Sequence, residues 1–155
     1  MKEDLRVYQN DGRITRDGIR IHEPGDFAGM HRAGRVAAQI LDDIAAHVFP
    51  GQTTGEIDRL ITEMVHQHGA QSATIGYRGY QHASCISVNH VVCHGIPGPK
   101  ALKDGDILNI DVTVIVDGWF GDTSRMYVAG NLGRKAERLI EVTMIAGNGI
   151  EAVGR

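Results

Sequence analysis

Cysteine, aromatic residues and long apolar runs are scarce in this 155-residue sequence. Its two cysteines, Cys85 and Cys93, are too few for a disulfide framework. Their spacing matches no paired-thiolate zinc site, so we expect both to be small core residues. We find no signal peptide, and no apolar run reaches the ~20 residues that cross a bilayer. These absences exclude a disulfide-rich secreted scaffold and a membrane-spanning protein, and they predict a cytoplasmic protein.

The charge is not gathered into blocks of one sign. The formal net charge is -3, and acidic and basic residues alternate along the opening segment, which argues against nucleic acid as a partner. With 42% hydrophobic and 23% charged residues, the composition is that of an ordinary globular protein. We therefore expect one domain over residues 1–155, consisting of a solvated arm at 1–17 and a compact body at 18–155.

Two amphipathic helices are predicted in the first half of the body. Asp26 is placed to cap the first helix, and Pro50 ends it. Thr53 and Glu56 have the spacing of a capping box for the second helix, which Gly69 ends. The apolar stripes with helical spacing are Phe27, Met30, Ala33, Ala37, Ile40, Leu41, Ile44 and Val48 in the first helix, and Ile57, Leu60, Ile61, Met64 and Val65 in the second.

Short extended segments follow the helices. We expect strands at 72–75, 84–88 and 91–93, then a β-hairpin of 107–116 and 119–128 around the turn dipeptide Asp117-Gly118. A third helix is expected over 133–146, with Ala136, Leu139, Ile140, Thr143 and Ala146 as its inner positions. This order predicts a mixed α/β (α+β) fold, in which helices cover one face of an antiparallel sheet.

The predicted hairpin carries two carboxylates among apolar, β-branched residues. A two-residue turn pairs Thr113 with Asp122, which places Asp111 diagonally across from Asp122 on the same face. Carboxylates in such surroundings are costly unless cations or donors compensate them. The pair therefore suits divalent metal ions, the alternative being an exposed polar face on which Asp122 makes local turns.

Two further segments contain candidate site residues. His94 follows a short apolar run and precedes a glycine and a proline, where the backbone can present its ring to a cleft. A hydrogen-bonded structural histidine is the alternative. Tyr77 and Tyr80 lie on a glycine-containing loop before Cys85, and this loop either lines an apolar pocket or covers the core.

Several blocks together resemble one enzyme family, the type I methionine aminopeptidases. The blocks are GYRGY at 76–80, CISVN at 85–89, VVCHGIP at 91–97, LKDGDI at 102–107, NIDVT at 109–113 and GDTS at 121–124. The resemblance runs from about residue 18 onward. The CHGIP block fits these enzymes better than the related prolidases and creatinases.

The resemblance implies half of a pita-bread fold, with two divalent metals (Co, Mn, Fe or Zn) held between two similar halves. It implies that Asp111 is a ligand of one metal and that Asp122 bridges both. It also implies that His94 hydrogen-bonds the scissile amide, and that Tyr77, Tyr80 and Cys85 line the methionine pocket. The implied reaction is attack of a metal-activated water on the peptide bond after the N-terminal methionine of nascent proteins, which makes the ribosome a candidate partner.

The resemblance covers the first half of the family's fold only. A further histidine ligand and two glutamate ligands, one of them the general base, belong to the second half and have no counterpart here. We therefore expect this chain to be inactive alone and to self-associate through the exposed half-fold face. The alternative function is a catalytically silent relative that binds a protein or the ribosome.

Overall fold

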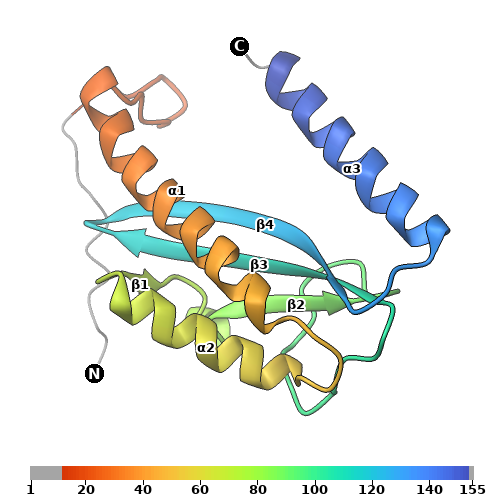
Figure 1. The fold of residues 1–155 in the computed structure, drawn as a ribbon. Coiled ribbons are helices and arrows are strands. Elements are labelled where there is room, and N and C mark those ends of the chain that lie inside the picture. The colour runs from red at the N-terminus through yellow and green to blue at the C-terminus, as the bar shows by residue number, and fades with distance from the viewer. Residues whose placement is uncertain (1–11, 154–155) are drawn as a thin grey trace.

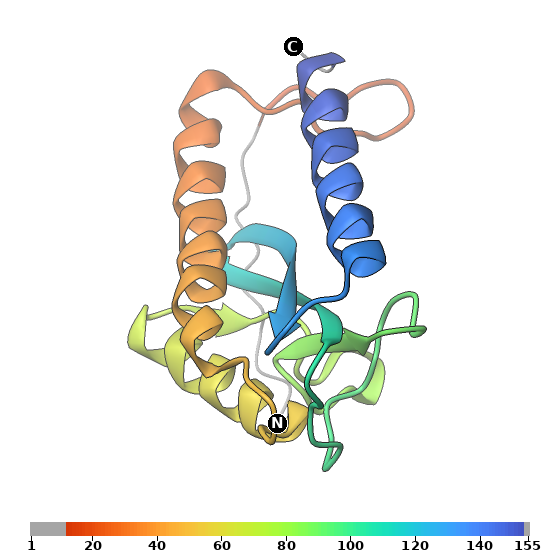
Figure 2. The ribbon, with the colours of Figure 1, turned by 45° about the vertical axis from the view of Figure 1, so that its right-hand side comes forward.

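The structure, a computed structural model, describes the backbone of residues 12–153 and the side chains of residues 12–144. Its elements are α1 (Pro24–Ile44), η1 (Ala45–His47), α2 (Thr54–Gln67), β1 (Gln71–Ser72), η2 (Tyr77–Gly79), β2 (Ser84–Val88), β3 (Asp106–Val116), β4 (Trp119–Ala129) and α3 (Arg134–Val153). Figure 1 shows α1 and α2 lying across one face of the sheet. Over most of its length, α3 stands clear of the sheet there and in Figure 2.

Strand β3 is the centre of the antiparallel sheet. Along one edge it pairs with β4 over the whole length of both strands, from the Asp106–Ala129 pair to the Val116–Trp119 pair. Its other edge is shared by β2, which pairs with residues 108–112, and by β1, which pairs with residues 114–115. This arrangement brings β2 and β4 to opposite sides of the same stretch of β3.

Alternation along β3 separates a core face from an open face. Leu108, Ile110, Val112 and Val114 are at most 1% exposed, and α1 and α2 pack on them through Ile40, Ile44, Ile57 and Ile61. The residues between them, such as Asp111 and Thr113, belong to the opposite face and are only half-buried. The predicted fold class, an antiparallel sheet with helices on one face, is confirmed.

The start of α1 differs from the prediction. Glu23, not Asp26, is the N-cap, and Asp26 accepts a hydrogen bond from the Glu23 backbone N–H at 2.9 Å. Phe27 and Met30, predicted to be buried, are 46% and 44% exposed. Gly29 faces inward instead, since a Cβ on it would lie 2.2 Å from the Trp119 indole nitrogen. The side chain that fills this contact comes from the sheet, which periodicity within the helix cannot reveal.

Helix α2 agrees with its prediction. Thr53 accepts from the Glu56 backbone N–H at 3.1 Å, and Glu56 accepts from the Thr53 backbone N–H at 3.0 Å, which completes the capping box. Gly69 follows the helix with a φ of 65°, the left-handed conformation expected of it. The helix is therefore fixed at both ends by local sequence.

The remaining differences lie outside the hairpin. Residues 91–93 form no strand but belong to the exposed loop that follows β2. Helix α3 runs to Val153, beyond the predicted residue 146, and Leu139 is 58% exposed and not on a buried stripe. The inner position predicted for Ala146 lies outside the described side chains. No helix within residues 12–153 is long and apolar enough to cross a membrane.

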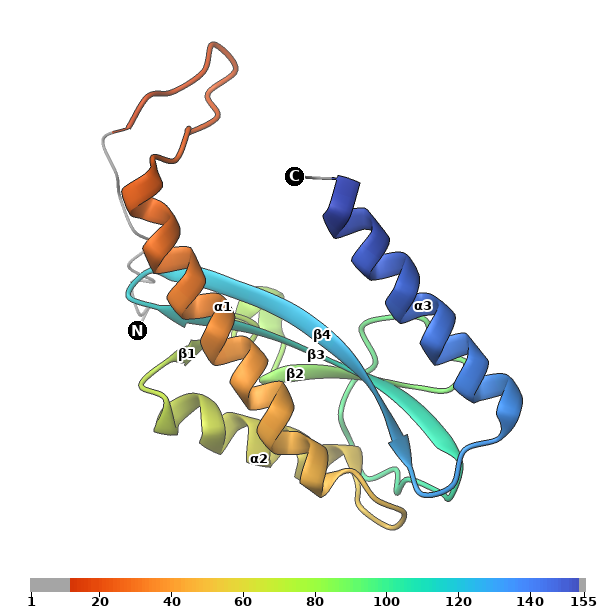
Figure 3. The ribbon, with the colours of Figure 1, turned by 45° about the horizontal axis from the view of Figure 1, so that its top comes forward.

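The predicted arm at 1–17 lies partly outside the described residues. From residue 12 onward the chain folds back on itself, with a β-bridge between Ile14 and Arg20. Figure 3 shows this segment extending beyond the first turn of α1, away from the sheet. The division at residue 17 stays a prediction.

Candidate metal centre

Asp111 and Asp122 project from the same face of the β3–β4 hairpin. Thr113 is the register partner of Asp122, and Ser124 is that of Asp111, so the two carboxylates are diagonal neighbours. Asp117 and Gly118, with φ values of 50° and 82°, form the two-residue turn that fixes this register. The sequence-based placement of the pair is confirmed.

The surroundings of Asp111 on the open face raise the pKa of its carboxyl. Partial burial and, next, the nearby charge of Asp122 raise the pKa of the Asp111 carboxyl, while His94 acts in the opposite direction. Asp122 and His94 are thus both near enough to Asp111 to influence its charge. A bound cation would reverse both unfavourable effects, because it supplies the opposite charge that the site lacks.

Thr113 orients one oxygen of the pair. Its hydroxyl donates a 2.9 Å hydrogen bond to Oδ1 of Asp122, directly across the ladder. The other carboxylate oxygen of Asp122 remains available as an acceptor or ligand. Sequence reasoning paired these two residues without predicting this bond, although a hydroxyl directly opposite a carboxylate is its usual signal.

His94 is held at the edge of this face by its neighbour. The Gly95 backbone N–H donates to Ser87 Oγ at 3.1 Å, and the Gly95 carbonyl accepts from Ile86 N at 2.8 Å. A Cβ on Gly95 would lie 2.2 Å from the Ile86 carbonyl oxygen, so only glycine fits. His94 itself is exposed and has a φ of 53°. The loop thus docks on β2 through Gly95 and leaves the histidine ring outside the core.

The donor set fits part of a divalent metal centre. Carboxylate oxygens are the ligands that hard and borderline divalent ions take, and a same-face pair can share them. Among the described residues, however, no three histidine, cysteine, aspartate or glutamate side chains gather closely enough to hold an ion. Asp111 and Asp122 could therefore supply at most two of the ligands that a divalent ion needs.

The two tyrosines predicted to line a pocket lie in different surroundings. The Tyr80 hydroxyl donates to the Ser84 carbonyl at 2.8 Å and lies 3.5 Å from Cys85 Sγ. Burial, followed by the Cys85 contact, raises the pKa of Tyr80 above its usual value. Tyr77 is 64% exposed, with the Arg78 guanidinium 5.5 Å from its ring centre. Tyr80 and Cys85 are thus together, while Tyr77 stands on the outer side of the loop.

The prediction that both cysteines are core residues is wrong. Cys85 is half-buried, and Cys93 is exposed. Cys85 is the register partner of Asp111, which places its thiol on the carboxylate face. Cys93 belongs to the loop that carries His94, and that loop lies outside the sheet. The prediction of core burial rested on residue type alone. The position of each cysteine depends instead on strand register for Cys85 and on the loop after β2 for Cys93.

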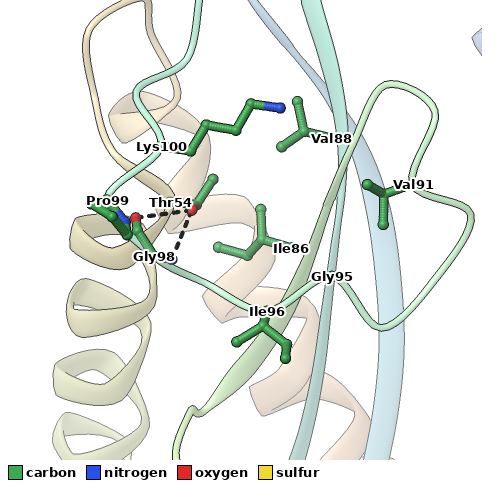
Figure 4. Close-up of a pocket in the computed structure, with 9 residues that line it drawn as sticks. All are labelled: Thr54, Ile86, Val88, Val91, Gly95, Ile96, Gly98, Pro99 and Lys100. Atoms are coloured by element: carbon green, nitrogen blue, oxygen red, sulfur yellow. Dashed lines mark hydrogen bonds between the residues drawn. The ribbon is translucent and has the colours of Figure 1, made fainter.

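A separate cavity of about 450 Å³ lies near the same loop (Figure 4). Ile86 and Val88 of β2 form one wall, and Gly98 and Lys100 belong to the opposite segment, beside the first turn of α2. The Thr54 hydroxyl donates to the Gly98 carbonyl at 3.1 Å and fixes this segment. None of the predicted site residues lines the cavity. Ile86 and Val88 point to the core face, so this cavity is separate from the carboxylate pair.

Comparisons with known proteins agree with this geometry. Residues 28–153 match metallopeptidase family M24. The chain is 52% identical over 136 residues to a methionine aminopeptidase of Rickettsia prowazekii, covering 87% of this chain and 52% of that protein. The Escherichia coli K12 methionine aminopeptidase is 51% identical over 127 residues, covering 81% of this chain and 48% of that protein.

Solved structures give the same picture. The crystal structure of the Rickettsia prowazekii enzyme superimposes with a TM-score of 0.81 at 52% identity, over 83% of this chain and 52% of that one. A prolidase from Pyrococcus furiosus, 18% identical, superimposes with a TM-score of 0.70 over 81% of this chain and 36% of its own, which indicates a shared fold alone. The chain spans about half the length of the curated methionine aminopeptidases that it matches.

Proposed function

This chain belongs to metallopeptidase family M24, and on that premise we propose that it takes part in removing the N-terminal methionine from nascent proteins. In this proposal Asp111 and Asp122 would hold divalent metal ions through their carboxylate oxygens. These ions, which could be Co, Mn, Fe or Zn, would act as Lewis acids that activate water and polarise the peptide carbonyl. The described residues place no further ligand beside this pair.

The observation that carries the proposal is the position of the two carboxylates. Asp111 and Asp122 share one face of a hairpin, and after partial burial the charge of Asp122 further raises the pKa of Asp111 when no cation is bound. A purely structural face would gain nothing from keeping such a pair. Because the chain is 52% identical to a methionine aminopeptidase, we infer that the carboxylate pair serves peptide hydrolysis.

The other predicted site residues receive roles from their places around the pair. His94, on the exposed loop beside Asp111, is proposed to hydrogen-bond the scissile amide and orient it. Tyr80 and Cys85, which contact each other on the carboxylate side of β2, are proposed to form one wall for the methionine side chain. Tyr77 is proposed to add a second wall, since its ring is 64% exposed and therefore accessible to a substrate.

We predict that the 155-residue chain alone releases no methionine above background. Its described residues offer two carboxylate ligands and no third donor nearby, so bound ions are held weakly and no general base is positioned. The test is methionine release from a Met-Gly-Met peptide with Mn²⁺ or Co²⁺, followed by chromatography. The Asp122→Asn variant provides the background rate, and clear turnover that this variant lacks would contradict the prediction.

A catalytically silent binding relative is the competing proposal. It requires no carboxylate pair and no histidine, yet Asp111, Asp122 and His94 are all present on one side of the sheet. Ribosome co-sedimentation by the parent and by the triple alanine variant separates the two functions. Equal ribosome binding, together with an absence of metal binding by the parent, would favour the silent relative.

Self-association is the second expected property of the isolated chain. Leu139, Val142 and Met144 on α3 are each more than half exposed, at 58%, 53% and 60%. Leu139 and Val142 are three positions apart and so share one face of the helix, where exposed apolar side chains favour burial against another molecule. Light scattering after gel filtration should give a mass above the 16.8 kDa monomer. Leu139→Glu with Val142→Glu should restore the monomer, and a monomeric parent would contradict the prediction.

A further inference from the structure

A buried carboxylate outside the metal centre joins helix α2 to the loop that carries Tyr80. Asp58 is 6% exposed, and its Oδ1 accepts hydrogen bonds from the Ser84 backbone N–H at 2.9 Å and from Ser84 Oγ at 2.7 Å. Its Oδ2 lies 2.9 Å from Nδ1 of His82. A desolvated charge is tolerated only with such compensation, so the partners of Asp58 are fixed in place.

The partners of Asp58 lead directly to the proposed pocket wall. Ser84, the first residue of β2, accepts the hydroxyl of Tyr80 on its carbonyl at 2.8 Å, and Cys85 follows it in the chain. The His82 ring packs edge-on against Tyr80 with 5.5 Å between ring centres. Tyr80 and Cys85 are therefore both anchored, from two directions, to groups that Asp58 holds.

His82, whose ring contacts Asp58, is also held by a second hydrogen bond within the loop. The Thr74 hydroxyl donates to the His82 carbonyl at 2.7 Å, which ties the start of the loop to its end. His82 is thus held at its ring by Asp58 and at its backbone by Thr74. Between these two clamps the chain passes through Arg78, whose φ of 49° is costly for a residue with a side chain.

Electrostatics agrees with this arrangement. After burial and the contacts with Cys85, the charge of Asp58 is a further cause of the raised pKa of Tyr80. The Tyr80 hydroxyl therefore stays protonated and keeps donating to Ser84 through the neutral range. The carboxylate lies close enough to act on the tyrosine without contacting it.

We propose that Asp58 is a positioning residue for the methionine pocket: through Ser84 and His82 it fixes where Tyr80 and Cys85 stand. The inference rests on the proposed function for the meaning of the pocket. A role limited to attaching α2 to the sheet would lower stability when lost. It would leave the surroundings of the Cys85 thiol unchanged in the folded protein.

The test measures how readily the Cys85 thiol reacts, which requires neither metal nor turnover. The exposed Cys93 is first replaced in a Cys93→Ser parent, so that Ellman's reagent reports on Cys85 alone. In this background Asp58→Ala should raise the reaction rate about tenfold, because Tyr80 and Cys85 lose their anchor and the thiol becomes accessible. Circular dichroism confirms that each variant is folded under the assay conditions.

Asp58→Asn is the matched control. It removes the same charge but can still accept both hydrogen bonds from Ser84, so its rate should stay within about twofold of the Cys93→Ser parent. An unchanged rate in the alanine variant, or an equal rise in both variants, overturns the proposal. The first result would show that Asp58 does not position Cys85. The second would show that the charge of Asp58, and not its hydrogen bonds, controls the reactivity of the Cys85 thiol.

A milder variant keeps the test decisive if Asp58→Ala does not fold. Ser84→Ala removes only the 2.7 Å hydroxyl bond to Asp58 and should raise the Cys85 rate about threefold. No rise in this folded variant also overturns the proposal. Failure here leaves the metal-binding proposal intact, and failure to bind metal leaves the thiol measurement unaffected, so the two failures are distinguishable.

Discussion

Replacing Asp122 by asparagine is expected to abolish divalent metal binding by this chain. Its carboxylate is one of the two proposed ligands on the open face of the hairpin, and Asn offers a neutral oxygen in place of a charged one. Loss of a group that merely supports a ligand costs 10–100-fold in metal affinity, so loss of a ligand should cost at least about 100-fold. Asp111→Asn should have the same effect.

Paramagnetic broadening by Mn²⁺ is the suitable measurement, because it detects weak binding. In the parent chain, amide signals of β3 and β4 near residues 111 and 122 should broaden first, and both asparagine variants should lose this effect. Asp117→Asn is the matched control, since it removes an equal charge from the turn of the same hairpin, where the side chain is 73% exposed. Broadening that persists at the hairpin in both site variants would refute the metal centre.

Asp111 also links metal binding to stability. Because the pKa of Asp111 is raised in the folded protein, the folded state keeps its proton to a higher pH than the unfolded state does. Stability of the metal-free chain therefore falls as the pH rises through the interval between the unfolded and folded pKa values, and it stays reduced above it. At neutral pH with chelator, Asp111→Asn should unfold at a temperature equal to or above that of the parent. A clear drop would mean that the carboxylate is stabilising.

The second large effect is expected from Gly121→Ala, next to the proposed ligand Asp122. A Cβ on Gly121 would lie 2.3 Å from the carbonyl carbon and oxygen of Ala33 in α1. Both contacts are to backbone, so relief requires α1 to move away from β4. Overpacking costs typically 1–3 kcal/mol, and a clash between two backbones belongs at the upper end, at about 3 kcal/mol. Urea denaturation measures this loss directly.

Gly34→Ala controls for the glycine replacement itself. Gly34 lies in α1 beside the same contact, but a Cβ on it would have nothing within 4 Å. Alanine within a helix is favoured over glycine by roughly 0.5–1 kcal/mol, so this variant should be more stable than the parent. If Gly121→Ala were as stable as Gly34→Ala, the close approach of α1 to β4 would be wrong.

Local features were predictable because their causes lie within a few residues. The Asp117-Gly118 turn determined the register of β3 and β4, and hence the shared face of Asp111 and Asp122. The capping box of Thr53 and Glu56 determined where α2 begins. Both depend on contacts between neighbours in the chain, for which spacing and residue type are sufficient.

Features that join distant segments were not predictable in the same way. Asp58 lies between Ile57 and Ile61 in the buried part of α2, and a carboxylate there was the one available signal, but its partners follow 24 and 26 residues later. Trp119, at the start of β4, packs against Gly29 of α1, and Phe27 and Met30 are largely exposed, contrary to the prediction from helical spacing.

The sequence by itself determined the hairpin, its register and the pair of carboxylates, because strand alternation and a two-residue turn leave no freedom in which side chains share a face. Only the tertiary structure decided which face the helices cover, where the His94 loop docks and what Asp58 holds. Those outcomes depend on how separate elements pack, and packing is set by side chains that meet only after the chain has folded.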